Sequence, residues 1–351
     1  MRPLPRRGLL GSDTMIGFAV PPSLAADAPP PRRDGVRLLV ARPGGIVHAR
    51  FDELASHLAP GDLVVVNTSG ALPAAVDGAR GDGSPVSVHF AAALDDGDWV
   101  VEVRPAGRAS GPVPDLAPGD RLALPEGVSL SVVAPHPLGQ HRLWRSRVAV
   151  DVLPYLRRVG RPIGYAYLRQ RYPLAEYLTV FGWRPGSAEM PSAGRPFSTE
   201  LVTDLVRRGI VVAPVLLHAG VSSPEVGEPP QAERFEVPAQ TARLVTATRR
   251  WGGRVVAVGT TVARALESTV DSSGRVHPAQ GWTDLVLGPD RPARVVTGLI
   301  TGWHEPGASH LDLLEAVAGT ELVESAYEHA LRERYRWHEF GDSCLLLPDH
   351  R

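Results

Sequence analysis

A change of pattern in the middle of the chain constrains the fold most strongly. Short β-like runs, such as SPVSVHFAAAL and DWVVEVRPAG, follow one another between residues 71 and 150, separated by Gly, Asp and Pro. They recur roughly every ten residues without a helical period, which is typical of a small antiparallel barrel or sandwich. We therefore predict a β-barrel-like domain at residues 71–150, inserted between two parts of another domain.

The flanking sequence alternates strand and helix patterns. LVVVN at residues 63–67 is a continuous apolar run, typical of a strand buried on both faces. STELVTDLVRRG at residues 198–209 has the start and stop signals of a capped helix. We predict an α/β domain, a mixed sheet with flanking helices, formed by residues 36–70 and 151–351. Residues 1–35 are rich in Pro, Arg and Ala and are expected to be an irregular lead-in.

Composition narrows the class of protein. The net charge of the 351 residues is −1, and all 37 basic residues are arginine, so no lysine is present to form a Schiff base. Cys344 is the only cysteine, which excludes a disulfide framework and a cysteine-built zinc site. No apolar run reaches the roughly 20 residues that span a bilayer. These features indicate a cytoplasmic protein without a membrane partner.

The strongest local signal is RVVAVGTTVARALES at residues 254–268. A predicted buried strand ends at Gly259, and Thr260 and Thr261 then open a helix. Free backbone amides and hydroxyl groups at a helix N-terminus can bind an anion or a ribose hydroxyl group. Simple N-capping beside a tight turn is the alternative interpretation of the same residues. The segment is neither a phosphate-binding P-loop nor a full dinucleotide fingerprint.

Two further predicted strands end near a histidine. One runs into Trp303 and His304, and the other ends at His218. An aromatic ring beside a histidine at the carboxyl edge of a sheet can stack on a purine and move a proton. A packed tryptophan beside a loop histidine is the alternative. The histidines lack metal-ligand spacing, so we expect no metal site.

Several segments together resemble one family. The most specific are VAVGTTVARALES, and AYEHALRERYR followed by Gly-Asp; other similar segments run in family order from about Phe51 to Asp342. The chain resembles the S-adenosylmethionine:tRNA ribosyltransferase-isomerases of queuosine biosynthesis (QueA). That resemblance implies an α/β body with an inserted β-barrel.

The resemblance also implies an activity. Members of the family transfer and rearrange the ribosyl group of S-adenosylmethionine onto 7-aminomethyl-7-deazaguanine in tRNA, with release of adenine and methionine. S-adenosylmethionine is then a ribosyl donor substrate, and no metal is needed. The expected partner is tRNA or a small nucleoside acceptor, and we expect a monomer.

Residues of this chain match the family's motifs one by one. The match assigns catalysis to His304, His218 and Glu233. It assigns substrate binding to a larger set: Asn67, Gly259, Thr260, Thr261, Arg264, Trp303, Tyr335, Arg336 and Asp342.

The chain also departs from the family pattern. Thr68, Ser69 and Gly70 stand where the family has aspartate, threonine and arginine, and Pro196 replaces a histidine. Arg195 replaces a leucine in the same motif. The alternative to a working ribosyltransferase-isomerase is therefore a divergent paralogue that binds S-adenosylmethionine but uses a different acceptor or is inactive.

Overall fold

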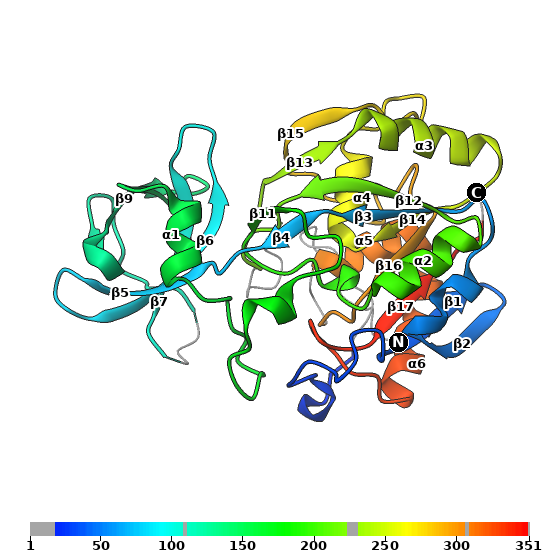
Figure 1. The fold of residues 1–351 in the computed structure, drawn as a ribbon, viewed down its shortest axis with the longest axis horizontal. Helices are drawn as coiled ribbons and strands as arrows, with labels where there is room; N and C mark the ends of the chain where they lie inside the picture. Colours follow the sequence, from blue (N-terminus) through cyan, green and yellow to red (C-terminus); the bar gives the residue numbers. More distant parts are fainter. Residues whose placement is uncertain (1–17, 108–110, 223–230, 306–308, 350–351) are drawn as a thin grey trace, which may run out of the picture.

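The molecule consists of an α/β body and a small β-barrel that lie side by side (Figure 1). The computed structural model describes residues 18–107, 111–222, 231–305 and 309–349. The first 17 residues of the expected lead-in lie outside this range. The following stretch contains a short 3-10 helix at Pro22–Leu24, and Leu24 and Ala26 are buried against the body.

A nine-stranded mixed sheet forms the centre of the body, within the described residues. Strands β12, β3, β14 and β16 run parallel to one another, so their carboxyl ends meet at the same edge. The strands occur in the spatial order β15 (Ala279–Thr283), β13 (Glu233–Val237), β12 (Val211–Leu217), β3 (Leu63–Asn67), β14 (Val255–Val258), β16 (Gly298–Thr301), β17 (Ser343–Leu346), β1 (Arg37–Arg42) and β2 (Gly45–Arg50).

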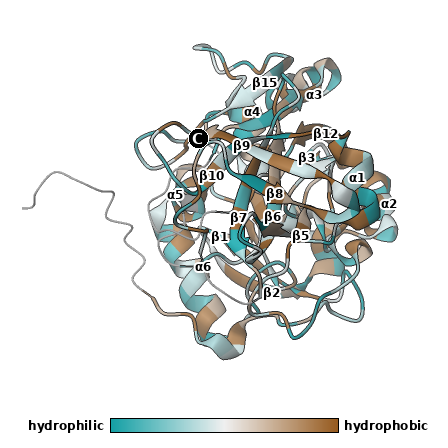
Figure 2. Cartoon of the chain, turned by 90° about the vertical axis from the view of Figure 1, so that its left-hand side faces the viewer, coloured by the Kyte–Doolittle hydropathy of each residue, from teal (hydrophilic) through white to brown (hydrophobic). Residues whose placement is uncertain are grey.

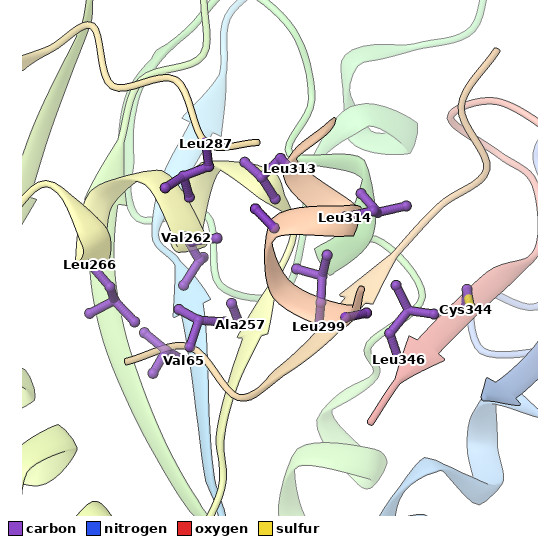
Figure 3. Close-up of a cluster of buried hydrophobic side chains, with 14 of the residues drawn as sticks. Val65, Ala257, Val262, Leu266, Leu287, Leu299, Leu313, Leu314, Cys344 and Leu346 are labelled. Carbon is purple, nitrogen blue, oxygen red and sulfur yellow. The ribbon is translucent and has the colours of Figure 1, made fainter. Parts of the chain in front are cut away.

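Helices cover both faces of this sheet, as its two-sided apolar strands require. Leu63 and Val65 of β3 pack into one core with α3 (Ala239–Arg250), α4 (Thr260–Glu267), α5 (Ser309–Ala318) and α6 (Thr320–Arg332), part of which is shown in Figure 3. Val64 and Val66 pack on the opposite face, against α2 (Thr199–Arg207) and a 3-10 helix at Phe51–His57. The side chains of the apolar run at residues 63–67 therefore pack into two separate cores, because successive side chains of a strand point to opposite faces of the sheet.

The predicted barrel is a closed antiparallel barrel of six strands. Its strands occur in the spatial order β10 (Leu143–Val148), β7 (Trp99–Pro105), β6 (Pro85–Ala93), β5 (Ala75–Arg80), β8 (Arg121–Ala123) and β9 (Ser129–Pro135). Viewed from the barrel side, these strands carry both hydrophobic and hydrophilic residues in front of the body (Figure 2). The helix α1 (Val152–Val159) packs into the barrel core through Tyr155 and Leu156.

A two-stranded parallel sheet joins the two parts. It pairs β4 (Ser69–Ala71) with β11 (Arg184–Ser187) at the point where the chain leaves the body for the barrel. The remaining regular segments are 3-10 helices at Pro125–Gly127, Leu174–Tyr177 and Ser192–Gly194. We propose residues 71–150 as the inserted domain, with α1 as its cap. Among the described residues, no helix has the length and apolar character needed to cross a membrane.

Candidate active site

A cavity of about 240 Å³ lies at the carboxyl edge of the parallel strands. Its walls include the residues that directly follow β12, β14 and β16, together with a loop before α2. Neighbouring parallel strands present their carboxyl ends together, and this is where open α/β sheets bind ligands. Six of the predicted residues line it: Glu233, Gly259, Thr260, Thr261, Arg264 and His304.

The start of α4 forms one wall of the cavity. Gly259 adopts a φ of +90°, which favours glycine, and a Cβ there would lie 3.2 Å from the Cβ of Ala193. As a glycine, the N-cap residue has no side chain with which to cap the helix. The Thr261 hydroxyl group accepts a hydrogen bond from Asn67 Nδ2 at 3.3 Å, so its own hydrogen can point elsewhere. The first turn of α4 can therefore donate hydrogen bonds to a ligand.

A buried ion pair forms the floor beside that helix. Arg264 pairs with Glu233, and its remaining donors reach the carbonyl oxygens of Leu285 (3.0 Å), Thr283 (3.2 Å) and Gln231 (3.3 Å). Burial raises the pKa of the Glu233 carboxyl group, while Arg264 and the Gly220 N–H oppose this rise. The arrangement fixes the β13 and β15 side of the cavity to α4.

His304 stands opposite, after β16. Its Nε2 lies 3.0 Å from the Thr301 hydroxyl oxygen, and its ring stacks on His310 with centroids 4.5 Å apart. Burial, with the nearby His310 and His338, holds the pKa of His304 well below its usual value. Burial also lowers the pKa of His310, to about 4. The pair is therefore neutral at physiological pH and can exchange hydrogen bonds without adding charge.

Three cavity residues were missed by reading the sequence. Glu189 accepts hydrogen bonds from the Ser222 backbone N–H (2.9 Å) and hydroxyl group (2.6 Å). Glu339 lies in the loop between α6 and β17 and also lines the cavity. Both glutamates lie in segments that resemble the family, but the sequence did not mark either one as a site residue, because only the folded loops bring them to the cavity wall.

Arg142 is the third, and it comes from the barrel. Its Nη1 donates to Glu102 Oε1 at 3.2 Å. Burial opposes ionisation of Glu102, but His89, Arg104 and Arg142 together lower its pKa to about 2. The barrel thus supplies a charged group to the site of the α/β body.

Asn67 and His218 lie behind the cavity wall. Asn67 is 4% exposed and bridges strands, donating to Leu217 O (2.8 Å) and accepting from Leu217 N (3.0 Å). His218 Nδ1 lies 2.7 Å from the Ser69 hydroxyl oxygen, and burial lowers its pKa to about 4. Both residues hold β3, β12 and the β4–β11 pair together.

The structure does not place the remaining four predicted residues in the cavity. Trp303 is 2% exposed and packs edge-on against Tyr327 with centroids 5.0 Å apart, because it points to the opposite side of the chain from His304. This position in the aromatic core gives no support to the predicted ligand-stacking role of Trp303. Tyr335, Arg336 and Asp342 form a structural clamp near β1, where Asp342 accepts the backbone N–H groups of Arg37 and Arg336, both at 2.7 Å.

The position of His218 yields a test. A Cβ on Gly186 would lie 2.3–2.6 Å from three atoms of the imidazole ring. We expect Gly186→Ala to displace the ring and lower the free energy of unfolding by about 1–3 kcal/mol, as overpacking does. Urea denaturation measures the change, with Gly164→Ala as the control, since nothing lies within 4 Å of that position. Equal stability of the two variants would contradict the described packing.

The fold and the cavity define a class of protein, an α/β protein with a cavity at the carboxyl edge of a mixed sheet and a small β-barrel beside it. The family model for the queuosine biosynthesis protein matches residues 14–346. The chain belongs to this family.

Relatives match over nearly the full length. The chain is 36% identical to the S-adenosylmethionine:tRNA ribosyltransferase-isomerase of Carboxydothermus hydrogenoformans, over 94% of this chain and 98% of that protein. It is 34% identical to the enzyme of the same name from Symbiobacterium thermophilum, with the same coverage. The crystal structure of the S-adenosylmethionine tRNA ribosyltransferase from Thermotoga maritima superposes with a TM-score of 0.53 at 29% identity, over 94% of this chain and 99% of that one.

Proposed function

We propose that this chain is an S-adenosylmethionine:tRNA ribosyltransferase-isomerase. It transfers and rearranges the ribosyl group of S-adenosylmethionine onto 7-aminomethyl-7-deazaguanine in tRNA and releases adenine and methionine. The observation that carries the proposal is the acidic cavity at the uncapped start of α4, in a chain that relatives with this activity in their names match over 94% of its length. The full-length match favours this function over an inactive paralogue.

The charges of the cavity suit the donor substrate. Glu189, Glu233 and Glu339 line it, and its two guanidinium groups each have a carboxylate partner. Arg264 pairs with Glu233, and Arg142 pairs with Glu102 of the barrel. The remaining negative charge favours a cation, because charges in a partly enclosed cavity interact more strongly than in water. S-adenosylmethionine carries a sulfonium cation.

Different residues of the cavity have different roles in binding the donor substrate. The open turn at Gly259, Thr260 and Thr261 offers donors to the hydroxyl groups or leaving base of the ligand. His304, held neutral and anchored on Thr301, exchanges a proton or a hydrogen bond with the reacting ribosyl group. His218 and Asn67, behind the cavity wall, and Glu233, which lines the cavity, position the walls.

Fewer features of the structure bear on the binding of the acceptor tRNA than on the binding of the donor substrate. The tRNA on which the family acts has an anionic backbone. Arginine side chains must contact that backbone in this protein, because the sequence has no lysine. Several arginines between residues 157 and 171 already have carboxylate partners: Arg158 pairs with Glu126, Arg161 with Asp77 and Arg169 with Asp27. Phosphate contacts are therefore expected from the exposed remainder, such as Arg157 and Arg171. A monomer acting in the cytoplasm completes the proposal.

Donor binding can be tested at Thr260. We expect Thr260→Val to weaken S-adenosylmethionine binding about fivefold or more, since loss of one hydrogen bond costs about 1 kcal/mol. Isothermal titration calorimetry measures the affinity. Thr203→Val, on the solvent side of α2, serves as a matched control and should bind as the wild type does. Equal affinities for the two variants would remove Thr260 from the donor site.

The activity itself is tested by adenine release. Enzyme, S-adenosylmethionine and tRNA that carries the aminomethyl base are incubated together, and adenine is followed by chromatography. We expect release only when both substrates are present. Release with unmodified tRNA, or none with the complete mixture, would contradict the proposed function.

A further inference from the structure

Among the described residues, Glu339 has a carboxyl oxygen beside the cavity that lacks a hydrogen-bond partner. Its Oε2 is inaccessible to solvent and forms no hydrogen bond, although the side chain lines the cavity. The other two cavity carboxyl groups differ: Glu233 accepts from Arg264 and Gly220, and Glu189 accepts from Ser222 and Tyr165. A buried polar atom without a partner costs free energy, so it indicates a group that is satisfied when a ligand binds.

The loop that carries Glu339 is held on both sides. His338 stacks on Tyr167 with centroids 4.2 Å apart. The guanidinium of Arg195 lies 4.8 Å from the centroid of the Phe340 ring, and Arg195 itself is fixed by Glu176 at 2.8 Å. Arg195, one of the departures from the family pattern, thus supports the residue that follows Glu339. The carboxyl group is placed by packing and does not depend on a freely moving loop.

The chemistry of the two substrates shows which one this carboxyl group fits. The sulfonium sulfur of S-adenosylmethionine has no N–H or O–H to donate. Its α-ammonium group has N–H donors but keeps its protons through the reaction, whereas the amine of the acceptor must lose a proton before it can act as a nucleophile. The aminomethyl group of the acceptor base is protonated in water and offers three N–H donors. A buried carboxylate oxygen without a partner fits an ammonium group best, because a charge-assisted hydrogen bond is the strongest available to it.

We propose that Glu339 binds the aminomethyl group of the acceptor and takes a proton from it, which leaves the neutral amine as the nucleophile. This inference rests on the proposed function. In the step, an N–H bond of the ammonium breaks and an O–H bond forms on Glu339; the electron pair stays on nitrogen. The nitrogen lone pair then forms a C–N bond to the ribosyl carbon, the bond between the ribose and adenine breaks, and its electron pair leaves with adenine.

The surroundings support proton exchange near neutral pH. Burial raises the pKa of Glu339 to about 7. No arginine in the described part of the chain pairs with it, in contrast to Glu102 and Glu233. The titratable and charged groups around Glu339 are Tyr165, Glu189, His304, Glu305, His310, His338 and Arg142, with Arg195 and Asp342 on a neighbouring small cavity that Glu339 also lines.

A binding experiment separates this inference from the proposed function. Two anticodon stem-loops are compared, one with the 7-aminomethyl base and one with a 7-methyl base, in the presence of S-adenosylhomocysteine. We expect the wild type to prefer the amine at least tenfold, and Glu339→Gln to lose that preference while it binds the methyl stem-loop as before. Glu328→Gln, an exposed carboxyl group on α6, is the control and should keep the preference.

Every other outcome contradicts either the role of Glu339 or the proposed function of the protein. If the wild type binds both stem-loops equally, or Glu339→Gln keeps the preference, the role of Glu339 is wrong and the proposed function stands. If neither stem-loop binds, the proposed function fails and the inference falls with it. Thermal melting of both variants confirms that the glutamine variant is folded.

The pH dependence of turnover is a second readout. Glu339 must be ionised to accept the proton, so kcat/KM of the wild type should fall as pH drops below about 7. Glu339→Gln should lower kcat at least a hundredfold and lose that acidic limb. An unchanged acidic limb in the glutamine variant would assign the titration to another group.

Discussion

Replacing Arg264 by methionine is expected to lower the free energy of unfolding by about 3–5 kcal/mol, because it leaves Glu233 as an uncompensated charge in a buried site. Both side chains are at most 13% exposed, and the guanidinium of Arg264 also bonds three backbone carbonyl groups. The change should detach β13 and β15 from α4 and abolish donor binding as well. Urea denaturation measures the loss.

Two variants make this expectation specific. The double variant Arg264→Met, Glu233→Met removes both charges and should recover much of the stability, since a buried pair can be replaced by apolar side chains at little cost. Arg208→Met breaks an exposed i, i+4 pair with Asp204 and should cost less than about 1 kcal/mol. A loss of similar size in Arg264→Met and Arg208→Met would contradict the structural role of the buried pair.

His304→Ala is expected to lower kcat/KM by about 10²–10⁴-fold, the range in which a positioned acid or base contributes. The ring stacks on His310 and bonds Thr301 inside the cavity, so its loss removes a proton-exchanging group beside the ligand. Steady-state adenine release measures the effect. The affinity for S-adenosylmethionine should change far less than the rate.

The sign of the pH effect distinguishes His304 from Glu339. Burial holds the pKa of His304 well below its usual value, so the imidazole stays neutral as pH falls from 8 to 6. The acidic limb near pH 7 should therefore persist in His304→Ala at its reduced rate. His277→Gln, on a half-exposed histidine paired with Asp271, is the control and should leave turnover unchanged. A His304 variant without an acidic limb would assign that titration to the histidine.

Reading the sequence predicted the architecture because local patterns carry it. The apolar run at residues 63–67 reflects a strand that is buried on both faces of the sheet. The strand-turn repeat at residues 71–150 reflects strands that are buried on one face, inside the barrel. The apolar spacing of FDELASHL at residues 51–58 predicts one amphipathic helix, and the structure has a 3-10 helix at Phe51–His57. Its apolar face does pack into the core, through Phe51 and Leu54.

The site was predictable only in part. Gly259, Thr260 and Thr261 carry a local signal, a glycine and two hydroxyl groups at the junction of strand and helix. Glu339 and Arg142 carry none, because their meeting at the cavity depends on how distant loops pack. Motif matching also marked Trp303 and Asp342, whose contacts are with the core and with backbone amides. A family motif contains residues that build the site as well as residues that touch the ligand.

The central claim is that ribosyl carbon passes from S-adenosylmethionine to the base in tRNA. It is tested most directly with S-adenosylmethionine labelled with carbon-13 in the ribose and tRNA that carries 7-aminomethyl-7-deazaguanine. After digestion, mass spectrometry of the nucleosides should show the modified base heavier by one ribosyl unit that retains every labelled carbon, with one adenine released per base converted. Adenine release without label in the tRNA, or label in a small nucleoside in place of the tRNA, would contradict the account.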